Sequence, residues 1–240
     1  MMPTVPSRVT GAYRWSMERI VVADAHAVAS TAAALVHDEI SAWPSIALGL
    51  AGGSTPLATH GLLAERDMDW SHVTAWIPDE RWVAPDHDDA NQRMVRESLT
   101  DAVGATLLAP DTTSGNPAQV ARRYGDRVIP VLTDPGRRSI VMLGMGTDGH
   151  TASLFPGTTA VEVSGRSYVA NFVPQLDVWR LTATFELLGT AHIVIFLVTG
   201  EAKAAMVGRI AAGDDVPAAR VGAQERVVWL MDEAAASLTS

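Results

Sequence analysis

The sequence contains no cysteine, and aromatic residues make up only 6% of its 240 residues. Without cysteine the chain forms no disulfide bond and no thiolate metal site, which suits a reducing compartment, so we expect a cytoplasmic protein. No apolar run approaches the roughly 18 residues of a membrane-spanning helix, and residues 1–6 lack the basic and apolar regions of a signal peptide. The sequence therefore predicts a protein that does not act at a membrane.

Positive charge is also scarce, since 18 Lys and Arg residues stand against 27 Asp and Glu residues, for a net charge of -9. Binding of a nucleic-acid backbone needs a basic face, so this balance argues against nucleic acid as a partner. Lys203 is the only lysine of the chain. It can hold a compact ammonium that a planar guanidinium does not replace, or it can persist by chance, and composition leaves both readings open.

Metal-ligand spacings are missing too. The seven histidines show no His-Glu-x-x-His or similar pattern, so we expect no metal and no other cofactor. His26 and His37 fall on one alanine-rich helical stretch, and His87 lies in an acidic run that is typical of a solvated loop.

Short apolar runs alternate with helical patterns along the chain, which predicts βα units. The apolar runs lie at 45–50, 73–77, 139–143, 192–198 and 226–230, and the helical patterns at 24–42, 57–65, 88–99, 117–131 and 201–211. We expect an α/β fold with a doubly wound, mostly parallel sheet and helices on both faces. Residues 167–184 alternate in polarity and predict some antiparallel strands.

No repeat or long linker divides the chain, because 104–116 and 134–138 read only as polar loops, so we predict a single domain over residues 1–240. Ligands of open α/β sheets bind outside the carboxyl ends of the strands. The loops that follow the predicted strands are therefore the candidate site, and they lie at 51–56, 78–81, 144–150 and 199–203.

The first of these loops reads Gly52-Gly53-Ser54-Thr55-Pro56. A helix that begins here presents free N–H groups and the positive end of its dipole, which suits an anion. An ordinary tight turn with a hydroxyl cap is the other reading. The loop is neither a P-loop, since no Gly-Lys-Ser/Thr follows, nor a nucleophile elbow, since Pro56 replaces the last glycine, so Ser54 is expected to bind and not to attack.

The third loop carries Gly144, Gly146 and Gly149, which match G-x-G-x-x-G. A dinucleotide site is disfavoured, because the match lies past the middle of the chain and Asp148 would face a pyrophosphate. Asp148 and His150 instead form an acid/base arrangement in which the carboxylate orients the imidazole. The alternative is a polar loop that caps a helix beginning near Thr151.

Other charged residues at strand ends can be read in two ways. Asp79 and Arg81 stand in an Asp-Glu-Arg run that is often only a solvated loop, although Arg81 can make a forked contact with a ligand. Arg180 precedes a β-patterned stretch, and Lys203 lies in the first turn of a helix. Either cation could equally be surface charge.

Taken in order along the chain, these segments resemble the 6-phosphogluconolactonase family of the wider glucosamine-6-phosphate isomerase/deaminase-like superfamily. The likeness covers about residues 20 to 230, and the segment 148–156, Asp-Gly-His-Thr-Ala-Ser-Leu-Phe-Pro, is highly specific. The supporting segments are Gly-Gly-Ser-Thr-Pro, Asp-Glu-Arg, Arg180-Leu181-Thr182 and Gly200-Glu201-Ala202-Lys203. Ala51 and Ala90 depart from the pattern, in which serines are common at both positions.

Deaminase-like members usually carry a glutamate where this chain has Phe155, and a tyrosine where it has Arg81. Without that carboxylate one base remains, which suffices for hydrolysis but not for deamination with an aldose-ketose shift. The resemblance therefore implies hydrolysis of 6-phospho-D-glucono-1,5-lactone to 6-phospho-D-gluconate, in the oxidative pentose phosphate pathway, with a small phosphosugar lactone as the partner.

The resemblance also implies roles for the site residues. His150 is the general base, Asp148 orients it, and Arg81 orients the sugar end or the developing oxyanion. The phosphate and the rest of the substrate are implied to contact Gly52, Gly53, Ser54, Thr55, Asp79, Gly146, Arg180 and Lys203. Arg81 and Arg180 can exchange roles. A catalytically idle sugar-phosphate sensor and a deaminase/isomerase remain alternatives, and the sequence leaves monomer and dimer open.

Overall fold

The computed structural model describes residues 18–239, so the N-terminal stretch 1–6, in which the sequence shows no signal-peptide pattern, lies outside the described residues. A seven-stranded sheet forms the centre, and each neighbouring pair of its strands is parallel. In spatial order the strands are β1 (Glu18–Val22), β10 (Arg226–Asp232), β9 (Ile193–Val198), β6 (Arg138–Gly144), β2 (Ile46–Leu50), β3 (Val73–Trp76) and β5 (Thr106–Leu108).

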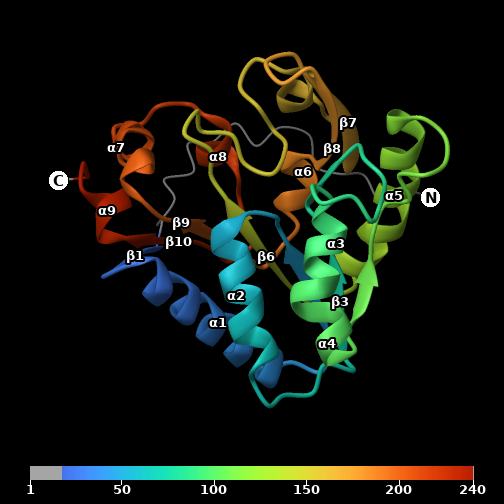
Figure 1. The fold of residues 1–240 in the computed structure, drawn as a ribbon, viewed down its shortest axis with the longest axis horizontal. Helices are drawn as coiled ribbons and strands as arrows, with labels where there is room; N and C mark the ends of the chain where they lie inside the picture. Colours follow the sequence, from blue (N-terminus) through green and yellow to red (C-terminus); the bar gives the residue numbers. More distant parts are fainter. Residues whose placement is uncertain (1–17, 240) are drawn as a thin grey trace.

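Helices connect these strands (Figure 1). In chain order they are α1 (Ala25–Ala42), α2 (Ser54–Ala64), α3 (Asn91–Val95), the π-helix η1 (Arg96–Thr100), α4 (Asp101–Val103), α5 (Pro117–Leu132), the 3-10 helix η2 (Thr159–Glu162), α6 (Phe185–Leu188), the 3-10 helix η3 (Glu201–Lys203), α7 (Ala204–Ala211), α8 (Pro217–Arg220) and α9 (Glu233–Ala236). No helix within 18–239 is long and apolar enough to span a bilayer.

The strand order shows a doubly wound sheet. From β2 the chain proceeds through β3 to β5 at one edge, and then returns to β6 and proceeds through β9 to β10 in the opposite direction. Because crossovers between parallel strands are almost always right-handed, this reversal puts the helices of the two halves on opposite faces. Figure 1 shows α1 and α2 side by side, and the two helices pack against each other. The expected fold class is confirmed, and the winding reverses between β2 and β6, which is where such sheets bind ligands.

Local sequence explains the main elements. Both β2 and β9 are buried along their whole length, as expected for central strands that are covered on both faces. Asp24 caps α1, because its Oδ1 accepts from the backbone N–H of Ala27 at 2.8 Å. The helical pattern expected from residue 24 thus begins one residue later, at Ala25.

A second, antiparallel sheet contains β4 (Asp79–Arg81), β8 (Val178–Ala183) and β7 (Tyr168–Val173), in that order, which confirms the antiparallel strands expected at 167–184. Only Ile77 and Pro78 separate β3 in the large sheet from β4 in the small one. The buried hydroxyl of Tyr124 accepts from the Ile77 N–H at 2.7 Å, and the hydroxyl of Tyr168 donates to the Ile77 carbonyl at 3.2 Å. Two tyrosines thus fix the crossing between the sheets.

The structure corrects four readings of the sequence. The stretch 104–116 is not entirely loop, since β5 joins the edge of the large sheet there. Asp79 and Glu80 do not lie in a solvated loop but are buried in β4. The helix considered near Thr151 does not form, because Thr151 instead pairs with Leu154 in an isolated β-bridge. The helix expected from residue 88 begins at Asn91 and continues as a π-helix.

Candidate active site

A cavity of about 570 Å³ lies at the carboxyl ends of β2, β6 and β9, beside the small sheet. It is therefore located where the winding of the sheet reverses. All of the site residues that the sequence singles out line this cavity: Gly52, Gly53, Ser54, Thr55, Asp79, Arg81, Gly146, Asp148, His150, Arg180 and Lys203. The fold brings together segments that are 150 residues apart.

The glycine loop ends at the start of α2. Gly53 occupies the N-cap position with φ 112°, a backbone conformation that favours glycine, and no side chain caps this end of the helix. Pro56 has no N–H, so Ser54 and Thr55 supply the N–H groups of the first turn. The Thr55 and Thr199 hydroxyls lie 2.8 Å apart and join α2 to the loop after β9.

Asn91 is a site residue that the sequence analysis missed. It lines the cavity, and its side-chain amide donates to the Asp79 carbonyl at 2.7 Å. A Cβ on Gly52 would lie 2.0 Å from the Asn91 Oδ1, so only glycine fits there. Asn91 therefore sets the position of the glycine loop against β4.

Glu80 holds Asn91 in turn. Its carboxyl oxygens accept backbone N–H groups from Arg81, Asn91 and Gln92 at 2.7 to 2.8 Å, and the side chain is fully buried. Burial raises the pKa of Glu80 to about 7, against the opposing effect of these hydrogen bonds. The carboxyl group joins β4 to the start of α3, and it lies behind the cavity wall.

Asp148 and His150 form the pair that the sequence predicts. The Asp148 Oδ1 lies 2.6 Å from the His150 Nδ1 and also accepts the His150 backbone N–H at 3.1 Å. Burial alone would raise the pKa of Asp148, but the hydrogen bond from the His150 backbone and the nearby imidazole outweigh it, so the pKa lies below its ordinary value. The ionised carboxylate accepts from Nδ1–H, which leaves Nε2 as the basic nitrogen.

The loop that carries this pair is a tight turn without a following helix. Gly149 has φ 82°, and the Gly146 N–H donates to the His150 carbonyl at 2.8 Å. A dinucleotide site of the G-x-G-x-x-G type needs a helix N-terminus directly after the glycines. The chain forms a turn and a β-bridge there instead, so the geometry argues against that reading.

Two arginines face each other across β4 and β8, where Arg81 and Arg180 are register partners. Within residues 18–239 neither guanidinium forms an ion pair, and the Nε of each is buried without a hydrogen-bond partner. Burial, together with the charge of Arg81, lowers the pKa of Arg180. The Arg81 Nη1 donates to the Asp89 carbonyl at 2.6 Å. The pair leaves positive charge available at the cavity.

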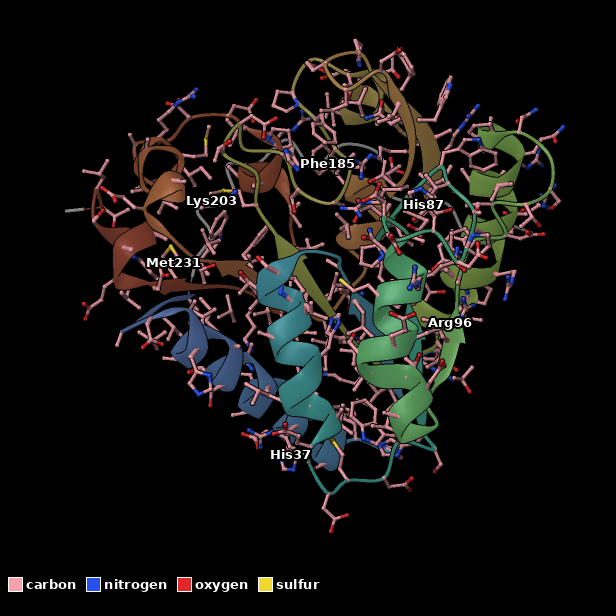
Figure 2. The ribbon with its side chains drawn as sticks, viewed as in Figure 1. His37, His87, Arg96, Phe185, Lys203 and Met231 are labelled. Atoms are coloured by element: carbon pink, nitrogen blue, oxygen red, sulfur yellow. The ribbon has the colours of Figure 1, made fainter. Side chains whose placement is uncertain are left out.

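Lys203 contributes the third cation. Lys203 is the last residue of η3, and its backbone N–H donates to the Gly200 carbonyl at 3.0 Å. The buried Asp232 carboxylate accepts the Gly200 N–H at 2.9 Å and also caps α9, so it fixes the loop that presents Lys203. Figure 2 shows His37 and His87 well away from Lys203, and neither histidine lines the cavity.

Known proteins share the sequence pattern and the fold of this chain. Residues 22–229 match the family model of glucosamine-6-phosphate isomerases/6-phosphogluconolactonase. A 6-phosphogluconolactonase of Synechocystis sp. is 35% identical over 200 residues, which cover 78% of this chain and 82% of that protein.

Solved structures show the same relation. The 6-phosphogluconolactonase of Trypanosoma brucei superimposes with a TM-score of 0.82 at 27% identity, over 94% of this chain and 100% of that one. The enzyme of Thermotoga maritima gives a TM-score of 0.80 at 27% identity, over 90% of this chain and 100% of that one.

With a doubly wound sheet and a cavity at its switch point, the chain belongs to the family of glucosamine-6-phosphate isomerases and 6-phosphogluconolactonases. The resemblance inferred from the sequence is thereby confirmed. Within this family it is an enzyme of the 6-phosphogluconolactonase type, a hydrolase.

Proposed function

We propose that the protein hydrolyses 6-phospho-D-glucono-1,5-lactone to 6-phospho-D-gluconate, as a step of the oxidative pentose phosphate pathway. The observation that carries this proposal is the Asp148–His150 pair, which lies in one cavity with an uncapped helix start and three cations. A base and a set of anion-binding groups are what hydrolysis of a phosphorylated lactone needs.

In the proposed reaction His150 acts as the general base. Its Nε2 takes a proton from water while the water oxygen bonds to the lactone carbonyl carbon, and Asp148 holds the resulting imidazolium. Collapse of the tetrahedral intermediate breaks the bond to the ring oxygen, and the imidazolium returns its proton to that oxygen. Lactones already hydrolyse spontaneously, so one positioned base with electrostatic support is chemically sufficient.

The remaining groups are proposed to bind the substrate. The phosphate contacts the Gly52-Gly53-Ser54-Thr55 loop, and Arg180 and Lys203 supply positive charge. Arg81 orients the sugar end or the developing oxyanion, and its role can be exchanged with that of Arg180. Asp79 and Gly146 complete the proposed contacts. The Asp79 Oδ2 already accepts from the Ser153 hydroxyl at 2.7 Å, which supports a fixed position for this carboxylate.

The decisive experiment measures hydrolysis of the lactone generated in situ, coupled to oxidation of 6-phosphogluconate and corrected for the spontaneous rate. His150→Ala should lower turnover about 10²- to 10⁴-fold. His26→Ala, which changes an exposed histidine of α1 outside the cavity, is the matched control and should leave turnover unchanged. A folded His150→Ala variant with wild-type turnover would refute the base assignment. Ligand binding without turnover would favour a sensor, and ammonia release from glucosamine 6-phosphate a deaminase.

The setting of this activity is also a proposal. We propose that the chain forms one domain and acts in the cytoplasm on a small-molecule substrate. Sedimentation of the purified protein distinguishes a monomer from a dimer.

A further inference from the structure

The imidazole of His150 is held from more than one side. Its ring stacks on the Phe155 ring, with centroids 4.0 Å apart and planes inclined by 24°. A Cβ on Gly146 would lie 2.2 Å from Nδ1 and 2.3 Å from Cε1, so the loop backbone closes the Nδ1–Cε1 side of the ring. The hydrogen bond to Asp148 occupies Nδ1 itself. These contacts leave the ring little freedom to turn.

The backbone after His150 brings Phe155 onto the imidazole. Thr151 and Leu154 pair in a β-bridge, and the Leu154 N–H donates to the Thr151 carbonyl at 2.9 Å. Ala152, between them, has φ 47°, which is uncommon for a residue with a Cβ. The resulting turn reverses the chain, so that Phe155, five residues on, lies against His150.

Polar contacts from the small sheet hold this turn in place. The Ser153 N–H donates to the Thr182 hydroxyl at 3.2 Å, and the Ser153 hydroxyl donates to Asp79 at 2.7 Å. The Asn171 side-chain amide donates to the Ser153 carbonyl at 2.9 Å. All four side chains are buried, so the turn that carries Phe155 is fixed to β4, β7 and β8.

We infer that Phe155 is a positioning residue, which keeps the His150 ring in the one orientation where Nδ1 faces Asp148 and Nε2 faces the cavity. The inference rests on the proposed function, in which Nε2 takes the proton from water. A flat aromatic face resists tilting of the imidazole, whereas an aliphatic side chain of similar volume offers no matching plane. If the base points in the wrong direction, kcat falls while substrate affinity changes little, because the base acts only in the transition state.

The experiment compares Phe155→Leu with Phe155→Tyr. Phe155→Leu should lower kcat about tenfold with KM changed less than about twofold, and Phe155→Tyr should retain most of kcat because it keeps the aromatic face. Phe196→Leu is the matched control, since Phe196 is a buried phenyl that stacks on Trp229 at 4.3 Å and lies outside the cavity lining. It should lower the melting temperature without lowering kcat. If Phe155→Leu does not fold, Phe155→Met replaces it.

A second readout does not depend on hydrolysis. Long-range ¹H–¹⁵N spectra report which imidazole nitrogen carries the proton, and His150→Gln assigns the signal. The wild-type protein should show one Nδ1–H tautomer at His150, and Phe155→Leu should show a mixture. An unchanged tautomer together with unchanged kcat overturns the inference, as does an equal loss of kcat in the Leu and Tyr variants. If the wild-type protein does not hydrolyse the lactone, the proposed function fails. The tautomer comparison still tests whether Phe155 positions the His150 ring.

Discussion

Arg81, Arg180 and Lys203 place three positive charges at one cavity of a chain whose net charge is -9. Within residues 18–239 no carboxylate forms an ion pair with any of them, whereas five other arginines are paired: Arg93, Arg138, Arg209, Arg220 and Arg226. Unpaired cations at a cavity are typical of a site for an anionic ligand. The only lysine of the chain is one of the three.

Lys203 gives the first test at the scale of a residue. If Lys203 binds the phosphate as proposed, Lys203→Ala should raise KM for the phosphorylated lactone about tenfold with little change in kcat, because a charge at that end contributes equally to substrate and transition-state binding. Steady-state kinetics at fixed ionic strength measure this. Lys203→Arg asks whether the compact ammonium is required. An unchanged KM in Lys203→Ala would show that the only lysine of the chain persists by chance. A fully active Lys203→Arg would show that a guanidinium can replace the ammonium at this position.

At the scale of elements, the sequence predicts the central part of the fold well and its edges poorly. The buried strands β2, β6 and β9 appear as continuous apolar runs because both of their faces are covered. Edge strands lack this signal. No residue of β5 or β1 is fully buried, and their apolar runs are short, Leu107–Leu108 in β5 and Ile20–Val22 in β1, so neither stands out in the sequence. Short edge strands depend on their neighbours for definition.

The candidate site likewise contains residues that the sequence predicts and residues that it does not. Its glycines, Asp148 and His150 are recognisable because their spacing within one loop carries the chemistry. Asn91 and Glu80 cannot be recognised in this way, because their roles depend on partners in other elements. The Asn91 side chain lies against Gly52, and the Glu80 carboxyl group accepts the backbone N–H groups at the start of α3. In the sequence, a carboxylate that becomes buried against hydrogen-bond donors from distant segments looks the same as a charged residue of a solvated loop.

The contact between the glycine loop and α3 gives a test at this scale. Gly52→Ala should lower kcat/KM at least about tenfold, because its Cβ would overlap the Asn91 Oδ1 at 2.0 Å and displace the loop. Gly61→Ala, within α2, meets nothing within 4 Å and is the matched control. It should leave kinetics unchanged and stabilise the fold by about 0.5–1 kcal/mol in urea unfolding. Wild-type kcat/KM in Gly52→Ala would show that Asn91 moves aside freely.

For the whole molecule, two buried groups make stability depend on pH in opposite directions. Burial raises the pKa of Glu80 to about 7, so between its ordinary value of 4.5 and 7 the folded state keeps a proton that the unfolded state has lost. Stability from this group falls as pH rises through that range. Burial lowers the pKa of His60 to about 4, so between about 4 and 6.5 the unfolded state alone is protonated, and stability from this group falls as pH drops through that range.

Glu80→Gln separates the two effects. The variant cannot titrate at position 80, although its amide leaves the Gln92 N–H without one acceptor, which costs stability at every pH. The wild-type advantage in unfolding free energy should therefore shrink as pH rises from 4.5 to 7, by up to about 3 kcal/mol. Urea unfolding of both proteins at several pH values measures this difference. A difference that is constant across the range would show that Glu80 is ionised throughout.

The pairing of β1 with β10 has a consequence for synthesis on the ribosome. Within residues 18–239, Glu18–Val22 pairs in the large sheet only with Arg226–Asp232, which lies about 200 residues later in the sequence. Translation proceeds at roughly 5–20 residues per second, so on the order of 10 to 40 s pass between the synthesis of β1 and that of β10. During that time its N–H and C=O groups stay open to other chains. The edge formed by β1 therefore stays open to mispairing until Arg226–Asp232 has been synthesised.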